Sequence, residues 1–325
     1  MSGRLLDEFT AAERGGKPRE DGITVAHDTF EEPNDHLLEE AADYIDFVKV
    51  GTSIPLIVEQ SKLQERIRRY HEFGIRVMSG GTLVEVALER GVVPQVLLRL
   101  KGLGFDMVEV SELAKDIALE EKRAIQDQVS ELSMDCVFFV GKGNRSRLST
   151  GTTISRIREA FELKSHRVVV EVPKDDGHSG QARSQDQVNW EALNEIVGTF
   201  GPPNLILETP YESQQTALIL ELGPGVNLSG VRVSDVLALE TKRLGLTAET
   251  LGLSRPLQEV EGSPASKFVY HLIRTERPID QATLIMRSGL PRRTIQAALS
   301  FLVDNNMVRE VPDSADARKH RYTIK

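Results

Sequence analysis

Two lysines, three glutamates and an asparagine stand at the ends of short apolar runs in this sequence. They are Lys49, Glu109, Lys142, Glu171, Glu208 and Asn227. A lysine at the last position of a covered strand needs a partner or an anion, because burial of an unpaired charge is costly. Carboxylate oxygens are ligands that Mg²⁺ selects, and this ion usually also binds oxygens of its substrate. These residues predict a site for Mg²⁺ and a phosphorylated substrate, where an enolate is stabilised while a lysine transfers a proton.

Each of these residues also has a plainer interpretation, because a polar residue after an apolar strand often caps a helix or faces solvent. A similar choice applies to the turn Gly80-Gly81-Thr82, which follows the apolar run near residue 77. This turn can present backbone N–H groups to a phosphate at the start of a helix. It can equally be a tight turn in which Thr82 is the N-cap. Both interpretations stay open from the residues alone.

The elements that must position these residues are eight short apolar runs, which alternate with helical patterns. The runs are ITVAH, IDFVKV, IRVMS, DMVEV, CVFFVG, RVVVEV, NLILE and GVNL. This alternation predicts βα units around a parallel sheet that is covered on both faces. Eight strands favour a closed (β/α)₈ barrel of the TIM type over the alternative, an open doubly wound sheet. Because the carboxyl ends of barrel strands meet at one mouth, we expect the polar residues around a single cavity.

The segments between the runs have the pattern of amphipathic helices. In VEQSKLQERIRRYHEFG, Leu63, Ile67 and Tyr70 follow helical spacing and Gly74 provides the stop. Further helices are expected in LVEVALERG, ALEEKRAIQDQVSEL, ISRIREAFEL, WEALNEIVGTFG, SQQTALILELG and SDVLALETKRLG. No strand is followed by GxGxxG or by a P-loop sequence, which argues against a dinucleotide or P-loop site.

The charge is distributed unevenly along the chain. The net charge is −9, but residues 264–325 contain 11 basic and 6 acidic residues, or +5, and the remainder contains 29 and 43, or −14. A polyanionic partner therefore fits only the C-terminal part. We predict an N-terminal segment 1–21, a barrel 22–252, a linker 253–265 with several Gly, Pro and Ser residues, and a C-terminal domain 266–325.

Several classes of protein are not favoured by this composition. No run of about 18 apolar residues occurs, so no membrane partner is expected. The first twenty residues mix charges of both signs without an apolar core, which argues against a signal or transit peptide and for a cytoplasmic protein. The single cysteine, Cys136, excludes a disulfide framework within the chain and is expected to be a small buried side chain.

The C-terminal domain has the pattern of a helix-turn-helix. One helix is expected in KFVYHLIRTER, a second in IDQATLIMRSG opened by Pro278, and a third in PRRTIQAALSFLVDNN after a short turn with Gly289. Two short strands, MVREV and HRYTI, then flank PDSADARK as a hairpin.

This order resembles winged-helix regulators of the broad MarR/ArsR type. The likeness implies that the start of the third helix enters the major groove of duplex DNA and that the hairpin meets phosphates or the minor groove. The residues concerned are Arg292, Arg293, Thr294 and Gln296 in the helix, and Arg318, Lys319 and Arg321 in the hairpin. The alternative is a winged helix used for protein contacts. By analogy with regulators that bind paired half-sites, we also expect a homo-oligomer, most simply a two-fold dimer.

The larger domain resembles the phosphosulfolactate synthase family. The matching segments, in order, are YIDFVKVGTS, FGIRVMSGGTLVEVA, LGFDMVEVSE, ILETPYESQQTALILELGPGVNLSGV and VLALETKRLGL. The resemblance covers most of residues 22–252 and none of the C-terminal domain. It implies a (β/α)₈ barrel that adds sulfite to phosphoenolpyruvate with Mg²⁺, giving phosphosulfolactate on the route to coenzyme M or sulfolactate.

The resemblance also implies a role for each matched position. Lys142 in VGK would protonate the enolate carbon after sulfite attack, and Lys49 in DFVK is the second catalytic candidate. Glu109 and Glu171 would bind Mg²⁺. The remaining candidates, which would bind substrate together with Lys49, are Gly80, Gly81, Thr82, Glu208 and Asn227.

Four strand-end segments differ from the family pattern. They read Asp28-Thr29-Phe30, Gly51-Thr52, Ser111-Glu112-Leu113 and Glu171-Val172-Pro173, and at least two positive groups for a multiply charged substrate are absent from them. The candidates to replace these groups are Lys174, His178, Arg145 and Arg147. Two functions therefore compete: a lyase with an accessory DNA-binding domain, and a transcriptional regulator whose barrel senses a small anionic ligand without turnover.

Overall fold

In the computed structural model, the chain forms two compact units, Met1–Ser254 and Arg255–Lys325. The structure describes residues 15–30, 35–51, 53–143, 147–174, 187–250, 262–275, 279–305, 307–312 and 320–324. Every helix in these ranges is too short or too polar to cross a lipid bilayer.

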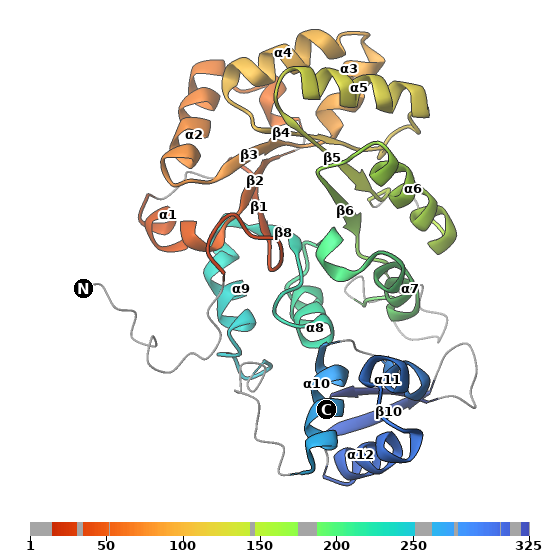
Figure 1. Cartoon of the computed structure of the whole chain (residues 1–325). Helices are drawn as coiled ribbons and strands as arrows, with labels where there is room; N and C mark the ends of the chain where they lie inside the picture. Colours follow the sequence, from red (N-terminus) through yellow and green to blue (C-terminus); the bar gives the residue numbers. More distant parts are fainter. Residues whose placement is uncertain are drawn as a thin grey trace. The chain divides into compact units, whose positions relative to one another are not determined.

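Eight parallel strands form a closed barrel in the first unit (Figure 1). They are β1 (Thr24–Asp28), β2 (Phe47–Val50), β3 (Arg76–Ser79), β4 (Met107–Val110), β5 (Asp135–Val140), β6 (Arg167–Glu171), β7 (Leu205–Glu208) and β8 (Leu228–Arg232). Each strand pairs with the next, and β1 closes the sheet by pairing with β8. The predicted (β/α)₈ barrel is confirmed, and the open sheet is wrong because it would leave β1 and β8 unpaired.

Helices cover the outer face of the barrel, as Figure 1 shows. They are α1 (Asp35–Ala41), α2 (Gln60–Glu72), α3 (Thr82–Glu89), α4 (Val93–Leu103), α5 (Leu119–Glu131), α6 (Thr150–Glu162), α7 (Trp190–Phe200), α8 (Glu212–Leu222) and α9 (Val236–Arg243). Short 3₁₀ turns are η1 (Ala42–Tyr44), η2 (Ile54–Leu56), η3 (Pro202–Asn204) and η4 (Val233–Asp235). Helices α1 and α4 were not predicted from the sequence. Helix α4 has proline in its first turn and ends at left-handed Gly104.

Apolar side chains fill both sides of the sheet. One cluster lies inside the barrel and includes Met78, Met107, Val137 and Phe139. A larger cluster lies between the strands and the helices and contains Cys136, which is buried as predicted. Burial also raises the pKa of this thiol above its ordinary value. Because apolar side chains occupy the barrel interior, it is a packed core rather than an open channel.

The second unit consists of three helices and a small antiparallel sheet. Its elements are α10 (Pro264–Thr275), β9 (Ile279–Asp280), α11 (Gln281–Ser288), α12 (Arg292–Asp304), β10 (Val308–Pro312) and β11 (His320–Ile324), and the sheet order is β10-β11-β9. Its core includes Val269, Leu284, Ile295 and Leu302.

The start of the second helix in this unit differs from the prediction. Helix α11 begins at Gln281, and Asp280 caps it by accepting a hydrogen bond from the Thr283 N–H at 2.8 Å. Ile279 and Asp280 are extended instead, because they pair with β11 as strand β9. Pro278, the predicted first helical residue, lies outside the described residues.

Candidate active site

A lysine and two glutamates form an ion cluster at the carboxyl ends of β2, β4 and β7. The Nζ atom of Lys49 lies 3.0 Å from Glu109 Oε2 and 2.5 Å from Glu208 Oε2. The side chains of Lys49 and Glu109 are 8% and 5% exposed, and that of Glu208 is 18% exposed. The barrel therefore joins three of the predicted residues in one nearly dry cluster, which we call the interior cluster.

Neighbouring strands complete the hydrogen bonds of Glu208. The Ser229 hydroxyl donates to Glu208 Oε2 at 2.9 Å, and His27 Nε2 lies 3.5 Å from the same oxygen. Burial alone would raise the pKa of Glu208, but the charge of Lys49 and the neighbouring His27 lower it below its ordinary value. Burial, together with the charge of Glu208, raises the pKa of Glu109 although Lys49 opposes this. The two carboxyl groups therefore differ in how readily they take up a proton.

Lysine 49 is charged in this setting. Burial alone would lower its pKa, but Glu109 and Glu208 raise it above the ordinary value. The ammonium also lies 5.7 Å from the centre of the Phe139 ring. Because its charge is already matched by two carboxylates, this lysine is a poor site for a further anion.

The turn Gly80-Gly81-Thr82 has protein partners for the N–H groups of its glycines. Gly80 N–H donates to the Val50 carbonyl at 3.2 Å, and Gly81 N–H donates to Glu109 Oε1 at 3.0 Å. A Cβ atom on Gly81 would lie 2.5 Å from Ser111 Oγ, so close packing requires a glycine there. The hydrogen bonds agree with the tight-turn interpretation of these glycines. Thr82 is the first residue of α3, and Gly81 occupies the N-cap position expected for Thr82.

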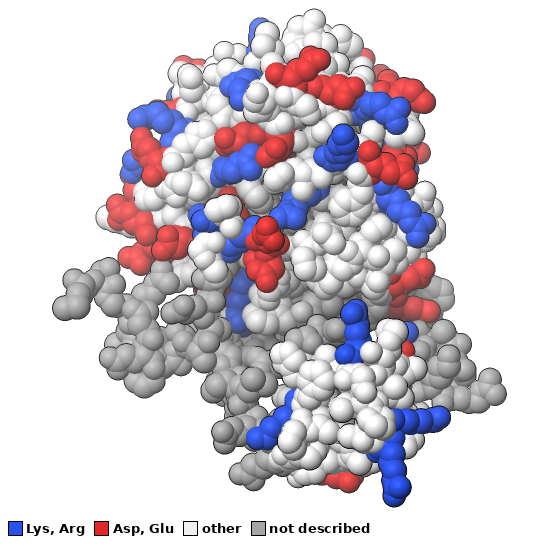
Figure 2. Space-filling view, viewed as in Figure 1, with Lys and Arg blue, Asp and Glu red and all other residues white. Residues whose placement is uncertain are grey.

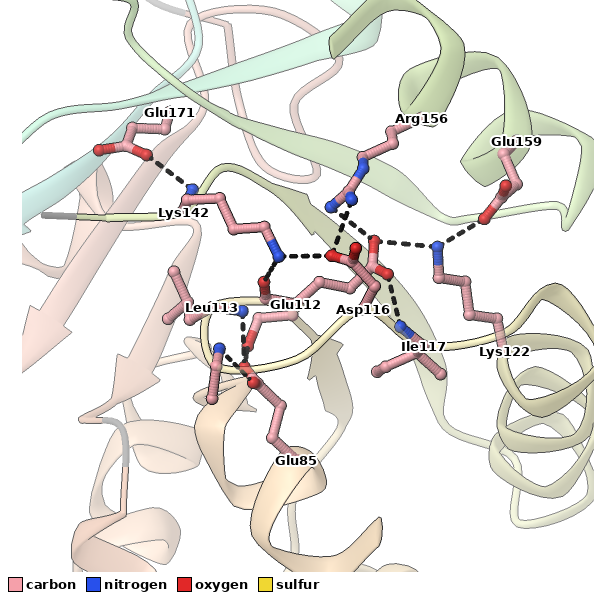
Figure 3. Close-up of polar contacts among 12 residues, drawn as sticks. Glu85, Glu112, Leu113, Asp116, Ile117, Lys122, Lys142, Arg156, Glu159 and Glu171 are labelled. Carbon is pink, nitrogen blue, oxygen red and sulfur yellow. Dashed lines mark hydrogen bonds and ion pairs between the residues drawn. The ribbon is translucent and has the colours of Figure 1, made fainter. Parts of the chain in front are cut away.

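Lysine 142 and Glu171 lie at the ends of β5 and β6. Glu171 pairs with Glu208 across β6 and β7, but the side chains of Lys142 and Glu171 contact other groups than the interior cluster. Oxygen Oε2 of Glu171 accepts the backbone N–H groups of Lys142 at 3.1 Å and Gly143 at 2.9 Å. The Lys142 side chain extends away from Glu171, and its ammonium donates to Asp116 Oδ1 at 2.5 Å and to the Glu112 carbonyl at 2.6 Å (Figure 3). The Glu171 carboxylate therefore holds the backbone of Lys142, whereas Asp116 and the Glu112 carbonyl hold its ammonium.

A cavity of about 320 Å³ lies beside these two residues. Its lining includes Lys142, Arg147, Glu171 and Lys174, and the first residues of α6. The three basic residues outnumber the one carboxylate, and the start of a 13-residue helix adds partial positive charge. The cavity is therefore suited to a small anion.

Asparagine 227 does not join the site. It precedes β8, which begins at Leu228, and so lies at the amino end of that strand. Its amide donates to the carbonyls of Pro203 and Leu205, and its oxygen accepts the N–H of Ile23 at 2.8 Å. The prediction that Asn227 ends the eighth strand is wrong, because its buried amide binds backbone groups at the opposite end of the barrel.

The remaining predicted residues lie in other surroundings. Thr82 lines a second cavity of about 360 Å³, together with Glu85 and Asp116. Among the described residues, no side-chain hydrogen bond or ion pair joins Lys142 or Glu171 to the interior cluster. Of the other cationic candidates, Lys174 contacts Glu171 at 3.3 Å and Arg147 donates to the Lys174 carbonyl, whereas Arg145 and His178 lie outside the described residues.

Sequence reasoning missed a cation next to the first strand. Asp28, at the end of β1, is buried and accepts hydrogen bonds from the Arg66 guanidinium and from the Tyr70 hydroxyl at 2.9 Å. Arg66 also stacks 4.3 Å from the Phe30 ring centre. Helix α2 therefore supplies positive charge where the first strand lacks it. The sequence pattern that could have indicated this contact is the spacing of Arg66 and Tyr70, which are four residues apart on one face of α2.

The predicted DNA contacts of the second unit lie partly within the described residues. Arg292, Arg293 and Gln296 are exposed on the first turns of α12, Thr294 is half-buried there, and Arg321 is half-buried in β11. Arg318 and Lys319 lie outside the described residues. On the face drawn in Figure 2, basic residues outnumber acidic ones over this unit, whereas the two are interspersed over the barrel.

Comparison with known proteins identifies relatives of the first unit. Residues 12–249 match the family model described as (2R)-phospho-3-sulfolactate synthase. The phosphosulfolactate synthase of Methanocaldococcus jannaschii is 30% identical over 236 residues, which cover 71% of this chain and 94% of the relative. That of Bacillus subtilis is 29% identical over 252 residues, covering 74% and 96%. A structure of 3-dehydroquinate dehydratase from Enterococcus faecalis has a TM-score of 0.48 and 12% identity, covering 69% of this chain and 93% of that chain.

Proposed function

Because the chain belongs to the phosphosulfolactate synthase family, we propose that its barrel is a carbon–sulfur lyase that adds sulfite to phosphoenolpyruvate. The observation that carries this proposal is the cavity lined by Lys142, Arg147, Glu171 and Lys174. Substrate and product bear several negative charges, and this cavity combines three cations with the start of α6. Arg147 and Lys174 then replace positive groups that are absent from the strand-end segments.

Lysine 142 is the general acid in this proposal. The sulfur lone pair of sulfite forms a bond to C3 of phosphoenolpyruvate, and the electron pair of the double bond moves to C2 and the adjoining carboxylate. The ammonium of Lys142 then gives its proton to C2, which yields phosphosulfolactate and a neutral amine that regains a proton from water. This role requires an ammonium beside the cavity, and Lys142 lines it.

Of the two predicted Mg²⁺ ligands, Glu171 fits better than Glu109. The Glu171 carboxylate lines the cavity, and its Oε1 atom has only a long contact of 3.3 Å with Lys174. Both oxygens of Glu109 are engaged, by Lys49 and by Gly81 N–H. The described residues contain no group of three or more acidic, histidine or cysteine residues that could form a protein cage. We therefore assign Mg²⁺ to Glu171, with water and substrate oxygens as its other ligands.

When bound there, Mg²⁺ would supply positive charge to the oxygens of the enolate. The protein residues orient the substrate around it: Arg147 and Lys174 hold anionic groups, and Lys142 faces C2. The interior cluster of Lys49, Glu109 and Glu208 supports the strand ends, and Glu208 is its most exposed member toward a ligand.

A turnover assay tests the enzyme. Purified full-length protein is mixed with phosphoenolpyruvate, sulfite and Mg²⁺, and substrate loss is followed. We expect Lys142→Ala to reduce kcat by about 10²- to 10⁴-fold, the usual contribution of a positioned acid. The control is Lys62→Ala, which removes an exposed lysine on α2 and should leave kcat unchanged. Full turnover by Lys142→Ala would exclude the assigned role, and no turnover by the unmodified protein would exclude the lyase.

We further propose that the second unit is a winged helix that binds duplex DNA. The support is the pair α11 and α12 joined by a short turn with left-handed Gly289, and the exposed arginines at the start of α12. A hairpin of β10 and β11 follows, as a wing requires. The net charge of +5 for residues 264–325 favours DNA as the partner, because its phosphate backbone is a polyanion, over the alternative of protein contacts.

Salt-dependent binding of full-length protein to duplex DNA tests this second proposal. Arg292→Ala and Arg293→Ala should each weaken binding, and loss of a phosphate contact should reduce the salt slope by about 1. The control is Lys267→Ala on α10, an exposed lysine of the same unit outside the predicted contacts. Binding that is absent, or insensitive to salt, would favour the alternative use of this unit for protein contacts.

A second candidate function is a transcriptional regulator with a sensing barrel. The observation that favours it is the second unit itself, which lies beyond residue 249, where the family match ends. Saturable binding of phosphoenolpyruvate without turnover, together with a change in DNA affinity, would support this function over the lyase.

A further inference from the structure

We propose that Asp116 is a positioning residue that holds the ammonium of Lys142, a residue that lines the cavity, and that the loop after β4 is built for this purpose. This inference rests on the proposed function, because it concerns the residue assigned there as the general acid. The loop comprises residues 111–118 and is called the clasp loop below. Its contacts are drawn in Figure 3.

The first support of the clasp loop is Glu85 on α3. This side chain is buried, and its carboxylate accepts hydrogen bonds from the Ser111 hydroxyl at 2.5 Å and from the N–H groups of Leu113 at 3.0 Å and Ala114 at 2.6 Å. A buried carboxylate with three donors from one loop fixes the loop backbone, since each lost contact would leave a charge without a partner.

The second support is Glu112, whose side chain folds back on its own loop. Its Oε1 atom accepts the N–H of Ile117 at 2.7 Å, which closes the turn. Its Oε2 atom binds Lys122 on α5 at 2.9 Å and Arg156 on α6 at 3.1 Å. Helices α5 and α6 therefore anchor the loop through Glu112, and α3 anchors it through Glu85.

The anchored loop presents two acceptors to Lys142. These are the carbonyl of Glu112 and the carboxylate of Asp116. Arg156 also donates to Asp116 Oδ1 at 2.8 Å. Hydrogen bonds from Lys142 and Arg156 lower the pKa of Asp116 to about 2, so the carboxylate stays ionised at neutral pH.

This arrangement suits a proton donor better than a stabilising ion pair. The Asp116 side chain is 69% exposed, and an ion pair with so exposed a partner stabilises a fold little. An ammonium has three N–H donors. The clasp loop accepts two of them, which leaves one donor direction for a substrate atom in the cavity that Lys142 lines. The loop thus fixes the position of the Lys142 ammonium and leaves one of its three N–H groups to donate to substrate.

Asp116→Asn in the full-length protein tests the inference. The amide keeps the shape and one acceptor but removes the charge. We expect kcat to fall about tenfold with KM changed less than twofold, because misplacement of a catalytic group by about 1 Å costs up to 10²-fold in rate. Asp116→Glu should recover most of kcat. The matched control is Asp127→Asn, which removes the same charge from an exposed position on α5.

A second readout does not depend on turnover. Lysine side chains are acetylated with a trace of acetic anhydride, and labelling of Lys142 is quantified by peptide mass spectrometry. We expect Asp116→Asn to accelerate labelling of Lys142 several-fold and Asp127→Asn to leave it unchanged, because Asp116 binds this amine and Asp127 does not. If the unmodified protein has no turnover, the proposed lyase fails while labelling still tests the positioning. Unchanged labelling of Lys142 in Asp116→Asn, or a raised KM with unchanged kcat, would overturn the role of Asp116.

Discussion

Lys49 and Lys142 both bind carboxylates, but their partners differ in exposure to solvent. Lys49 binds two glutamates in the barrel, where the side chains are 5% and 18% exposed. Lys142 binds Asp116, whose side chain is 69% exposed. Charges in a dry interior interact strongly but require full compensation, whereas exposed pairs are screened by water. The interior cluster therefore contributes to the fold, whereas the contact between Lys142 and Asp116 can change at little cost in stability.

The largest expected effect is loss of stability in Lys49→Ala. Removing the ammonium leaves two buried carboxylates without compensation, which should lower the free energy of unfolding by about 3–5 kcal/mol. Lys142→Ala should lower it by less than about 1 kcal/mol, because Asp116 becomes solvated. Urea unfolding followed by fluorescence of Trp190 reports on the barrel, because this single tryptophan lies in α7. If the free energy of unfolding fell equally in the two variants, the interior cluster would stabilise the fold no more than the exposed pair of Lys142 and Asp116.

An intermediate effect is expected where a glycine packs against the interior cluster. In Gly81→Ala, the new Cβ meets the Ser111 side chain and backbone within 2.8 Å and disturbs the hydrogen bond from Gly81 N–H to Glu109. The free energy of unfolding should fall by about 1–3 kcal/mol, the usual cost of overpacking. The control is Gly102→Ala in α4, where nothing lies within 4 Å of the added atom. That change should be neutral or stabilise by up to about 1 kcal/mol, and the same urea experiment measures both.

The smallest expected effect concerns pH. The pKa of Asp116 is lowered from 3.8 to about 2, so its contribution to stability is present above pH 4 and is lost as the pH falls toward 2. Because the side chain is exposed, this contribution should be under about 1 kcal/mol. Asp116→Asn should therefore be slightly less stable than the unmodified protein at pH 6 and nearly equal to it at pH 2. The measurement is the urea midpoint at pH 6, 4, 3 and 2, and a difference that persists at pH 2 would show that charge is not the cause.

The barrel could be predicted from sequence because its strands are continuous apolar runs. Parallel strands place their carboxyl ends together, so the convergence of Lys49, Glu109 and Glu208 followed from strand order. Asn227 was misplaced because apolar residues flank it on both sides, and a buried amide at the start of a strand has the same local pattern as one at its end.

The partners of Lys142 could not be predicted, because they come from irregular backbone. Asp116 and Glu112 lie in a loop without periodicity, and Arg156 reaches them from a helix 40 positions beyond Asp116 in the chain. Their meeting depends on how Glu85 and Lys122 fix that loop, and neither contact has a local signature. In the second unit, the helices followed from hydrophobic spacing, whereas the contacts of Arg318 and Lys319 stay predictions.

Closure of the sheet between β1 and β8 has a consequence for biosynthesis. Lys49 and Glu208 are 159 positions apart, and β8 ends at Arg232, so a ribosome must release most of the chain before these parts can meet. Until then the nascent polypeptide has two strand edges open to association with other chains. Contacts between such distant positions also slow folding. We therefore expect fragments that stop before residue 228 to accumulate as aggregates, even though each βα unit they contain is intact.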